Sequence, residues 1–201
     1  MSASIARWDE KHRAAPDELP APAGILRELL PLLRPGRELD VACGTGRNAI
    51  FLAERGWSVT ALDGSRVALE KLRLAAAERG VPADGPSEGD PAAGRSGRIE
   101  LLARDLDRDP LPSGSFDLIV CIRFLQRSLF PWLESSLRPG GMLLVETYTQ
   151  AQLQFEGGPR SPEYLLERGE LREAFPALRT IFYRELRAGQ GMASLLAQRR
   201  G

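Results

Sequence analysis

Two aspartates lie on either side of a short glycine turn near the start of the chain. Asp40 lies within an apolar run, the turn Gly44-Thr45-Gly46 follows, and Asp63 ends a second apolar run nineteen residues after Gly44. Glycines in such a turn let a ligand approach the backbone closely, and a helix that starts there presents free N–H groups. An acid about 20 residues further on is placed to bind the hydroxyls of an adenosine ribose. The alternatives are a plain tight turn and an acid that is exposed or caps the next helix.

The same turn also fits a competing ligand. Residues 44–49, GTGRNA, match G-x-G-x-x-A, a fingerprint of nicotinamide dinucleotide binding. Asp40 would then lie near a pyrophosphate, where a second negative charge is unfavourable. A ligand with a positively charged sulfur and an amino group would instead favour that acid. We therefore prefer the cationic ligand and keep a nicotinamide-dependent oxidoreductase as an alternative.

Strands and helices alternate through most of the chain, which is typical of a parallel sheet with right-handed crossovers. Only residues 188–191 separate the last two predicted strands, too few for a parallel crossover, so these strands are expected to be antiparallel. The predicted strands are 38–43, 58–63, 99–104, 116–122, 142–147, 179–187 and 192–199. The predicted helices are 22–33 with a kink or an early end at Pro31, 47–55, a long helix between a Ser65 cap and Gly80, 130–137, and a stretch that begins at 161–163.

Composition indicates one globular domain. The chain has 201 residues, of which 43% are hydrophobic and 27% charged, enough for a sizeable core. Residues 1–36 are predicted to form an N-terminal helical or lid segment, and residues 37–201 are predicted to form the main domain. Within that domain, residues 82–98 lack large apolar side chains and are predicted to be a mobile surface loop. Twenty-seven basic and twenty-seven acidic residues cancel, so neither a nucleic acid nor a membrane is expected as a partner.

The residues also favour a cytoplasmic protein without a His/Cys metal centre. The N-terminus is charged where a signal peptide is apolar, and no run reaches the ~20 apolar residues that span a bilayer. Cys43 and Cys121 lie in strand-like runs, unlike a disulfide framework, and His12 is the single histidine. We expect no metal, although carboxylate-bound magnesium stays open.

The motif D-V-A-C-G-T-G, followed by an acid at the end of the next strand, resembles the first two motifs of class I S-adenosylmethionine-dependent methyltransferases. The resemblance continues through A-R-D-L at 103–106, FDLIVCI and RPGGMLLVE, and covers roughly residues 37–147. One position departs from the family pattern, because Ala42 replaces its first glycine. The family implies a Rossmann-like α/β fold: a doubly wound, mostly parallel sheet of seven strands with an antiparallel C-terminal hairpin.

Within that family, RWD near the start, ACGTGRNAIFLAERGW and ETYTQAQLQFEGGPRSPEYLLERGELREAF resemble bacterial tellurite-resistance-type small-molecule methyltransferases. The resemblance implies S-adenosylmethionine as the donor, bound beyond the carboxyl ends of the strands that end at Cys43 and Ile122. According to the resemblance, Asp40 and the turn bind the methionine part of the donor, Asp63 binds the ribose and Asp105 binds the adenine. The methyl group then lies at the opening that follows the fourth strand. The expected donor-binding residues are Asp40, Ala42, Cys43, Gly44, Gly46, Asp63, Gly64, Ser65, Asp105, Leu106, Cys121 and Arg123.

Methyl transfer from a sulfonium is an in-line displacement with an activated donor, so positioning supplies most of the catalysis. No catalytic residue is assigned, although Glu146, Tyr148 or an unpaired aspartate are candidates for an optional base. Arg47 and Arg123 are the expected contacts of an anionic acceptor, with a solvated surface position as the alternative for Arg47.

Aromatic residues at two places are candidates for closing the site. Trp8 and His12, four residues apart, either cover the donor or anchor the N-terminal segment, and anchoring is favoured. Tyr148 and Phe155 are expected to wall the acceptor pocket. The preferred function is a small-molecule methyltransferase. The alternatives are an RNA or protein methyltransferase, a nicotinamide-dependent oxidoreductase, and a protein that binds the donor without turnover.

Overall fold

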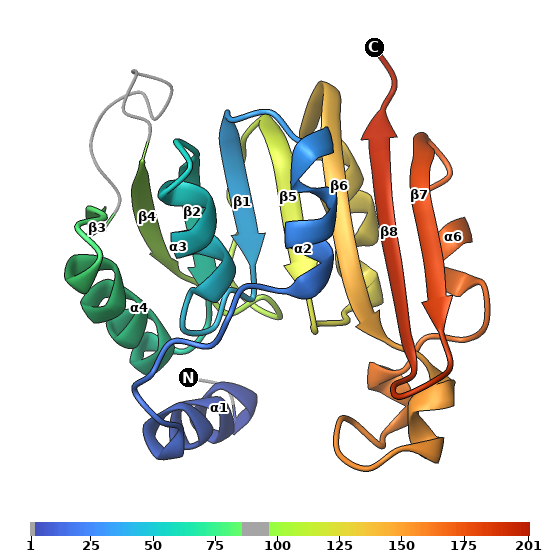
Figure 1. Ribbon diagram of the computed structural model, residues 1–201, viewed down its shortest axis with the longest axis horizontal. Coiled ribbons are helices and arrows are strands. Elements are labelled where there is room, and N and C mark those ends of the chain that lie inside the picture. Colours follow the sequence, from blue (N-terminus) through green and yellow to red (C-terminus); the bar gives the residue numbers. More distant parts are fainter. Residues whose placement is uncertain (1–2, 86–96) are drawn as a thin grey trace. The chain divides into compact units, whose positions relative to one another are not determined.

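The structure is a computed structural model that describes residues 3–85 and 97–201 (Figure 1). Its contacts divide the chain into two units, Met1–Ser113 and Gly114–Gly201. Among the described residues, no helix has the length and apolar character that a bilayer crossing requires.

The first unit has four parallel strands in the order β3-β4-β2-β1. These are β1 (Arg37–Val41), β2 (Ser58–Asp63), β3 (Ala83–Asp84) and β4 (Arg98–Ala103). Its helices are α1 (Ala3–Ala14), α2 (Gly24–Leu29), which continues into the 3-10 turn η1 (Leu30–Leu32), α3 (Arg47–Ala53) and α4 (Arg66–Glu78). In Figure 1, α1 lies near the carboxyl ends of β1 and β2.

Local sequence signals explain most of these elements. The Ser65 hydroxyl accepts a hydrogen bond from the Ala68 N–H, which confirms the predicted cap of α4, and the α4 stripe that includes Leu72 is buried. The predicted break at Pro31 is also present, because the α-helix ends at Leu29 and a 3-10 turn follows.

The segment predicted as a mobile surface loop, residues 82–98, is in part a strand. Residues 86–96 lie outside the described residues, but Ala83 and Asp84 form β3, which pairs with Ile99 and Glu100 of β4. Ala83 is buried, so even this short stretch has an apolar anchor. The described residues therefore contain eight strands, one more than predicted.

The second unit also has four strands, in the order β5-β6-β8-β7. They are β5 (Phe116–Ile122), β6 (Leu137–Tyr148), β7 (Leu178–Leu186) and β8 (Met192–Arg199). The pair β5 and β6 is parallel, whereas β8 runs antiparallel to both β6 and β7, as predicted for the C-terminal hairpin. The helical elements are η2 (Arg127–Leu129), α5 (Phe130–Ser135), η3 (Gln150–Gln154), η4 (Pro162–Tyr164) and α6 (Glu170–Glu173).

Two expectations in the second unit were wrong in detail. The turn predicted at residues 139–141 is instead part of β6. The pairing of β6 with β5 shifts in register between Phe116 and Leu118. The helical stretch predicted from 161–163 shrinks to the single turn η4. The carbonyl groups of Glu163 and Leu165 instead accept hydrogen bonds from a distant side chain, Arg127.

Candidate donor-binding site

The turn after β1 has an unusual backbone. Ala42, Gly44 and Gly46 have φ values of 55°, 57° and 80°, in the left-handed region that favours glycine. Ala42 therefore takes the conformation for which the family pattern uses a glycine. A non-glycine residue in this region costs about 1–2 kcal/mol, and such strain is concentrated at functional sites.

The two glycines of the turn serve different purposes. A Cβ atom on Gly46 would lie 2.2 Å from Leu72 Cγ, so this glycine is needed for the close approach of α4. A Cβ on Gly44 would meet only His12 Cε1, at an ordinary 3.7 Å. Of the two, Gly44 is the position that leaves backbone open to a ligand.

Asp63 joins the two turns that follow β1 and β2. Its Oδ2 accepts a hydrogen bond from the Gly44 N–H and its Oδ1 one from the Ser65 N–H, both at 2.8 Å. Burial raises the pKa of Asp63, and the two hydrogen bonds oppose that rise. Each oxygen keeps a further lone pair, so this fixed carboxylate can still accept hydroxyl groups.

Asp40 is buried, with an exposed fraction of 2%, and its Oδ2 has no hydrogen-bond partner among the described residues. Burial, and then the charge of Asp63, raise the pKa of Asp40 from its usual 3.8 to about 7, although Arg47 and the Ala49 N–H oppose the rise. An unpaired buried oxygen is costly, so it indicates a missing partner.

Glu38 is a second buried acid, which the sequence analysis did not single out. It lies two residues before Asp40, on the same face of β1, and is fully buried with both carboxyl oxygens unpaired among the described residues. Burial, and then Asp40, raise the pKa of Glu38 well above its usual value. The two-residue spacing along a strand was the signal that could have revealed it.

Helix α1 contacts both turns. Ile5 packs on Gly64 so closely that a Cβ atom added to this glycine would lie 2.9 Å from Ile5 Cγ1. The Ser65 hydroxyl donates a 2.5 Å hydrogen bond to Asp9 Oδ1. Trp8 stacks on His12 with ring centroids 5.8 Å apart but remains 45% exposed. Ile5 and buried Asp9 therefore attach this helix to the turn after β2. Of the predicted pair, Trp8 is largely exposed, and His12 lies at the turn after β1.

His12 is half-buried beside Gly44. Burial lowers the pKa of His12, while the charges of Asp63 and Asp9 oppose that effect. The single histidine of the chain is thus placed at the ligand-facing turn, although its role was left open by the sequence.

A cavity of about 300 Å³ lies at the end of β2 and β4. Gly64 and Asp105, both predicted to bind the donor, line it together with Ile5 of α1. Asp105 Oδ1 accepts the Asp107 N–H at 3.1 Å, which orients the carboxylate, and neighbouring Leu106 is half-buried. The volume and the acid suit a planar heterocycle with an amino group.

Two predicted residues lie in the second unit, at the carboxyl end of β5. Cys121 is buried, with its Sγ 3.8 Å from the Phe124 carbonyl. Arg123 is exposed and has a left-handed φ of 60°, while its N–H donates to the Glu146 carbonyl at 2.7 Å. Glu146 Oε2 accepts the Ser194 hydroxyl at 2.6 Å.

Other candidates have simpler roles. Burial raises the pKa of Cys43, so its thiol is not a ready nucleophile. Arg47 is half-buried, and its charge acts on Asp40. Within residues 3–85 and 97–201, no group of three His, Cys, Asp or Glu side chains is arranged to hold a metal ion.

Comparison with known proteins assigns the family. Residues 39–141 match the family described as methyltransferase domain, and the chain belongs to that family. This confirms the predicted class I S-adenosylmethionine-dependent methyltransferase resemblance, with S-adenosylmethionine as the family's donor.

Individual relatives agree with this assignment. The chain is 32% identical to the ubiquinone biosynthesis O-methyltransferase of Marinobacter nauticus over 65% of its own length and 51% of the relative. It is 31% identical to the glycine N-methyltransferase of Rattus norvegicus over 55% of its length and 39% of the relative. The chain thus spans about half or less of these curated relatives.

The fold has close structural counterparts. The solved structure of TehB from Haemophilus influenzae matches with a TM-score of 0.69 at 18% identity, covering 89% of this chain and 62% of TehB. The predicted Rossmann-like fold is therefore confirmed, with eight strands in the described residues in place of seven.

Proposed function

We propose that this protein transfers a methyl group from S-adenosylmethionine to a small-molecule acceptor by in-line displacement. The observation that carries the proposal is the buried Asp40 carboxylate, whose Oδ2 is unpaired at the end of β1 in a chain of the methyltransferase domain family. A cationic donor offers that oxygen the partner it lacks. A pyrophosphate would instead add a second negative charge.

The residues of the first unit fit the donor. Asp40 would bind its cationic methionine part beside the open backbone of Gly44, and Asp63 would accept the ribose hydroxyls. Asp105 in the 300 Å³ cavity would accept the adenine amino group. When bound, the donor supplies an activated methyl group. The remaining predicted contacts are Ala42, Cys43, Gly46, Gly64, Ser65 and Leu106 in this unit and Cys121 and Arg123 at the methyl-donor mouth.

The N-terminal segment would act as a lid. Helix α1 contacts Gly64 through Ile5 and Ser65 through Asp9, and its His12 lies beside Gly44. A helix held on both donor-binding turns excludes water from the ribose and limits donor exchange. This supports residues 1–36 as a helical lid next to a main domain at 37–201.

The acceptor class is supported by the relatives. The names of both curated methyltransferases described above refer to small-molecule acceptors. One name specifies methylation on oxygen and the other methylation on nitrogen. The balanced charge of the chain favours a small molecule over RNA, and we place the protein in the cytoplasm without a membrane partner.

A ligand-stabilisation experiment tests the donor. S-adenosylhomocysteine at 100 times its Kd should stabilise the protein by about 2.7 kcal/mol, or roughly 5–10 °C in Tm for a chain of this size. NAD and NADP at the same concentration should give no shift. Asp40→Asn should weaken the stabilisation, whereas Glu78→Gln on the exposed end of α4 should not. Stabilisation by NAD or NADP in place of S-adenosylhomocysteine would overturn the proposal.

A further inference from the structure

The second unit contains a long irregular segment at residues 149–169, between β6 and α6. It has only the short turns η3 and η4 and one bridge between Thr149 and Leu166. The segment starts at the carboxyl end of β6, and in open α/β sheets ligands bind beyond the carboxyl ends of parallel strands. Long segments of this kind inside a folded domain are usually functional.

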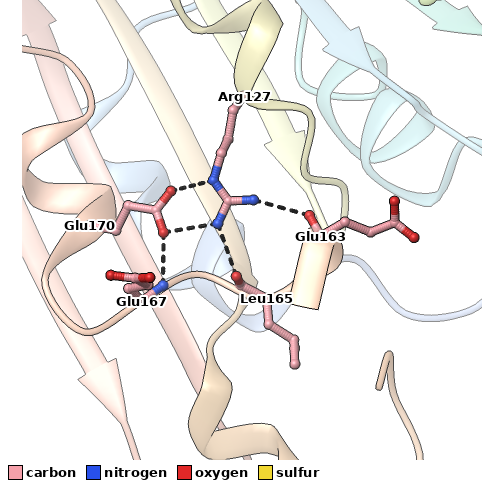
Figure 2. A network of polar contacts seen from close by, with 5 residues as sticks. All are labelled: Arg127, Glu163, Leu165, Glu167 and Glu170. Atoms are coloured by element: carbon pink, nitrogen blue, oxygen red, sulfur yellow. Dashed lines mark hydrogen bonds and ion pairs between the residues drawn. The ribbon is translucent and has the colours of Figure 1, made fainter. Parts of the chain in front are cut away.

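Residues 161–170, here called the strap, make several hydrogen bonds with one distant side chain, that of Arg127 (Figure 2). The Arg127 guanidinium, on η2 after β5, binds both oxygens of Glu170, with Nε–Oε1 at 2.5 Å and Nη2–Oε2 at 2.9 Å. The same group donates to the carbonyl of Glu163 at 3.1 Å and to that of Leu165 at 3.0 Å. Glu170 Oε2 also accepts the Glu167 N–H at 2.7 Å.

The strap has further attachments, among them the Leu166 carbonyl, which accepts the Gln150 N–H at 2.9 Å. The Leu166 N–H donates to the Tyr148 carbonyl at 2.9 Å, which joins the strap to the end of β6. The Gly169 N–H donates to Glu185 Oε1 at 2.7 Å, which joins it to β7. Arg127 adds the attachment to the loop that follows β5, so the strap is fixed to three parts of the unit.

This arrangement is suited to positioning more than to stability. The Arg127 side chain is 41% exposed and that of Glu170 24%, and ion pairs in such places add little to the free energy of folding. A planar guanidinium nevertheless sets the direction of four hydrogen bonds at once. All four end on the strap, so their main effect is on its geometry.

We propose that Arg127 is a positioning residue for the acceptor. It holds the strap against the loop after β5, so that the acceptor-binding surface of the second unit is formed before the acceptor arrives. A preformed surface lowers the ordering cost of binding. The inference rests on the proposed function, and it assigns Arg127 to acceptor binding, not to donor binding.

The test compares Arg127→Lys and Arg127→Met with the wild type. Lysine keeps the charge but cannot make the paired contact with Glu170 together with both carbonyl contacts. The matched control is Arg73→Met, because Arg73 makes the same paired contact with Glu70, at 2.9 and 2.7 Å, and both residues of that pair belong to the one helix α4. Hydrogen exchange should accelerate at least about tenfold at the amides of Leu165 and Glu167 in both Arg127 variants and stay unchanged there in the control.

Activity then separates positioning from folding. The acceptors are the small-molecule fraction of a bacterial extract supplemented with glycine, catechol and dithiothreitol, and the donor carries tritium on its methyl group. For the best acceptor, Arg127→Lys should raise KM at least about tenfold with a smaller change in kcat, while the Kd of S-adenosylhomocysteine should stay within about twofold of the wild type. Arg73→Met should change none of these quantities.

The contrary outcomes are distinct. Faster exchange in the strap with an unchanged acceptor KM would make Arg127 a purely structural residue and overturn the inference, while the proposed function stands. Unchanged exchange and unchanged KM would do the same. A wild type that binds no S-adenosylhomocysteine, or that binds it and methylates nothing in the mixture, would overturn the proposed function and the inference with it.

Discussion

Two pairs of charged residues, one pair in each unit, have opposite surroundings. In the first, Glu38 and Asp40 are buried on one face of β1, and three of their four carboxyl oxygens have no hydrogen-bond partner among the described residues. In the second, Arg127 and Glu170 lie near the surface, where each is engaged by several partners.

The contrast separates two kinds of functional group. An unpaired buried acid destabilises the free protein. Protonation reduces this cost, and a ligand that provides the missing partner offsets it. A paired surface group costs little, and its benefit is to fix geometry. Glu38 and Asp40 therefore have the features of groups that lack a partner in the free protein, and Arg127 and Glu170 those of a rigid support.

Glu38 should give the greatest change in stability. Glu38→Leu should stabilise the protein by about 2–3 kcal/mol at pH 7, because it removes a buried carboxyl group without partners. The pKa of Glu38 is raised in the folded state, so the wild type loses stability as the pH rises above its usual value of 4.5, and the gain from leucine should grow over that range. Urea unfolding at pH 5 and pH 8 measures both effects. A loss of stability at both pH values would show that Glu38 has a partner that stabilises it.

The next effect concerns donor affinity at Asp40. A folded-state pKa of about 7 means that, below that pH, the ammonium group of the ligand's amino-acid part must displace a proton from Asp40. The affinity for S-adenosylhomocysteine should therefore fall about tenfold for each pH unit below 7, as measured by calorimetry. Asp40→Asn should bind weakly with a flat pH profile. His12→Asn should keep the slope, and loss of the slope in that variant would assign it to the histidine.

A smaller change in stability, with the opposite pH dependence to that of Glu38, is expected at Glu170. Burial raises the pKa of Glu170, but the hydrogen bonds from Arg127 and Glu167 outweigh it and the net pKa is lowered. Its contribution is therefore present above the usual 4.5 and lost as the pH falls through the lower folded-state value. Glu170→Gln should cost about 0.5–1 kcal/mol at pH 7 in urea unfolding. Glu70→Gln, in the exposed pair on α4, should cost less, and equal losses would remove the distinction between strap and surface.

A change no larger than that of Glu170→Gln is expected at the strained residues of the two strand ends. Ala42 after β1 and Arg123 after β5 both have a left-handed φ. Ala42→Gly and Arg123→Gly should each stabilise the protein by about 0.5–1 kcal/mol in urea unfolding, because glycine adopts this region without strain. Ala77→Gly, at an exposed position within α4, should instead destabilise by about 1 kcal/mol. Destabilisation at Ala42 would show that its methyl group is needed in the turn.

Much of the fold could be predicted from local patterns. The ranges of β2, β5 and β8 agree with the structure residue for residue, and the Ser65 cap is present. These elements follow from apolar runs, turn residues and a capping hydroxyl, which act over a few residues. Asp40, the glycine turn and Asp63 were also proposed from local patterns, because strand ends and glycine turns mark the ligand-binding edge of an open sheet. The other donor residues were proposed from the family resemblance and stay predictions.

The features that were missed depend on distant parts of the chain. Gly46 is required by Leu72 of α4, and the strap is shaped by Arg127, 36 residues before Glu163 and 43 before Glu170. The anchoring of α1 through Asp9 depends on Ser65, 56 residues further on. Such contacts cannot be predicted from a pattern of neighbouring residues, because the contacting residues lie far apart in the sequence.

The amino-acid order alone was enough to indicate the family, the alternation of strands and helices, and the acids at the strand ends, because periodicity and turn chemistry are local. The folded arrangement was needed to show that Glu38 and Asp40 share a buried face, that α1 contacts the turns after β1 and β2, and that Arg127 binds the strap. Burial and long-range hydrogen bonds depend on which residues meet after folding, and these contacts set both the pKa of an acid and the position of a loop.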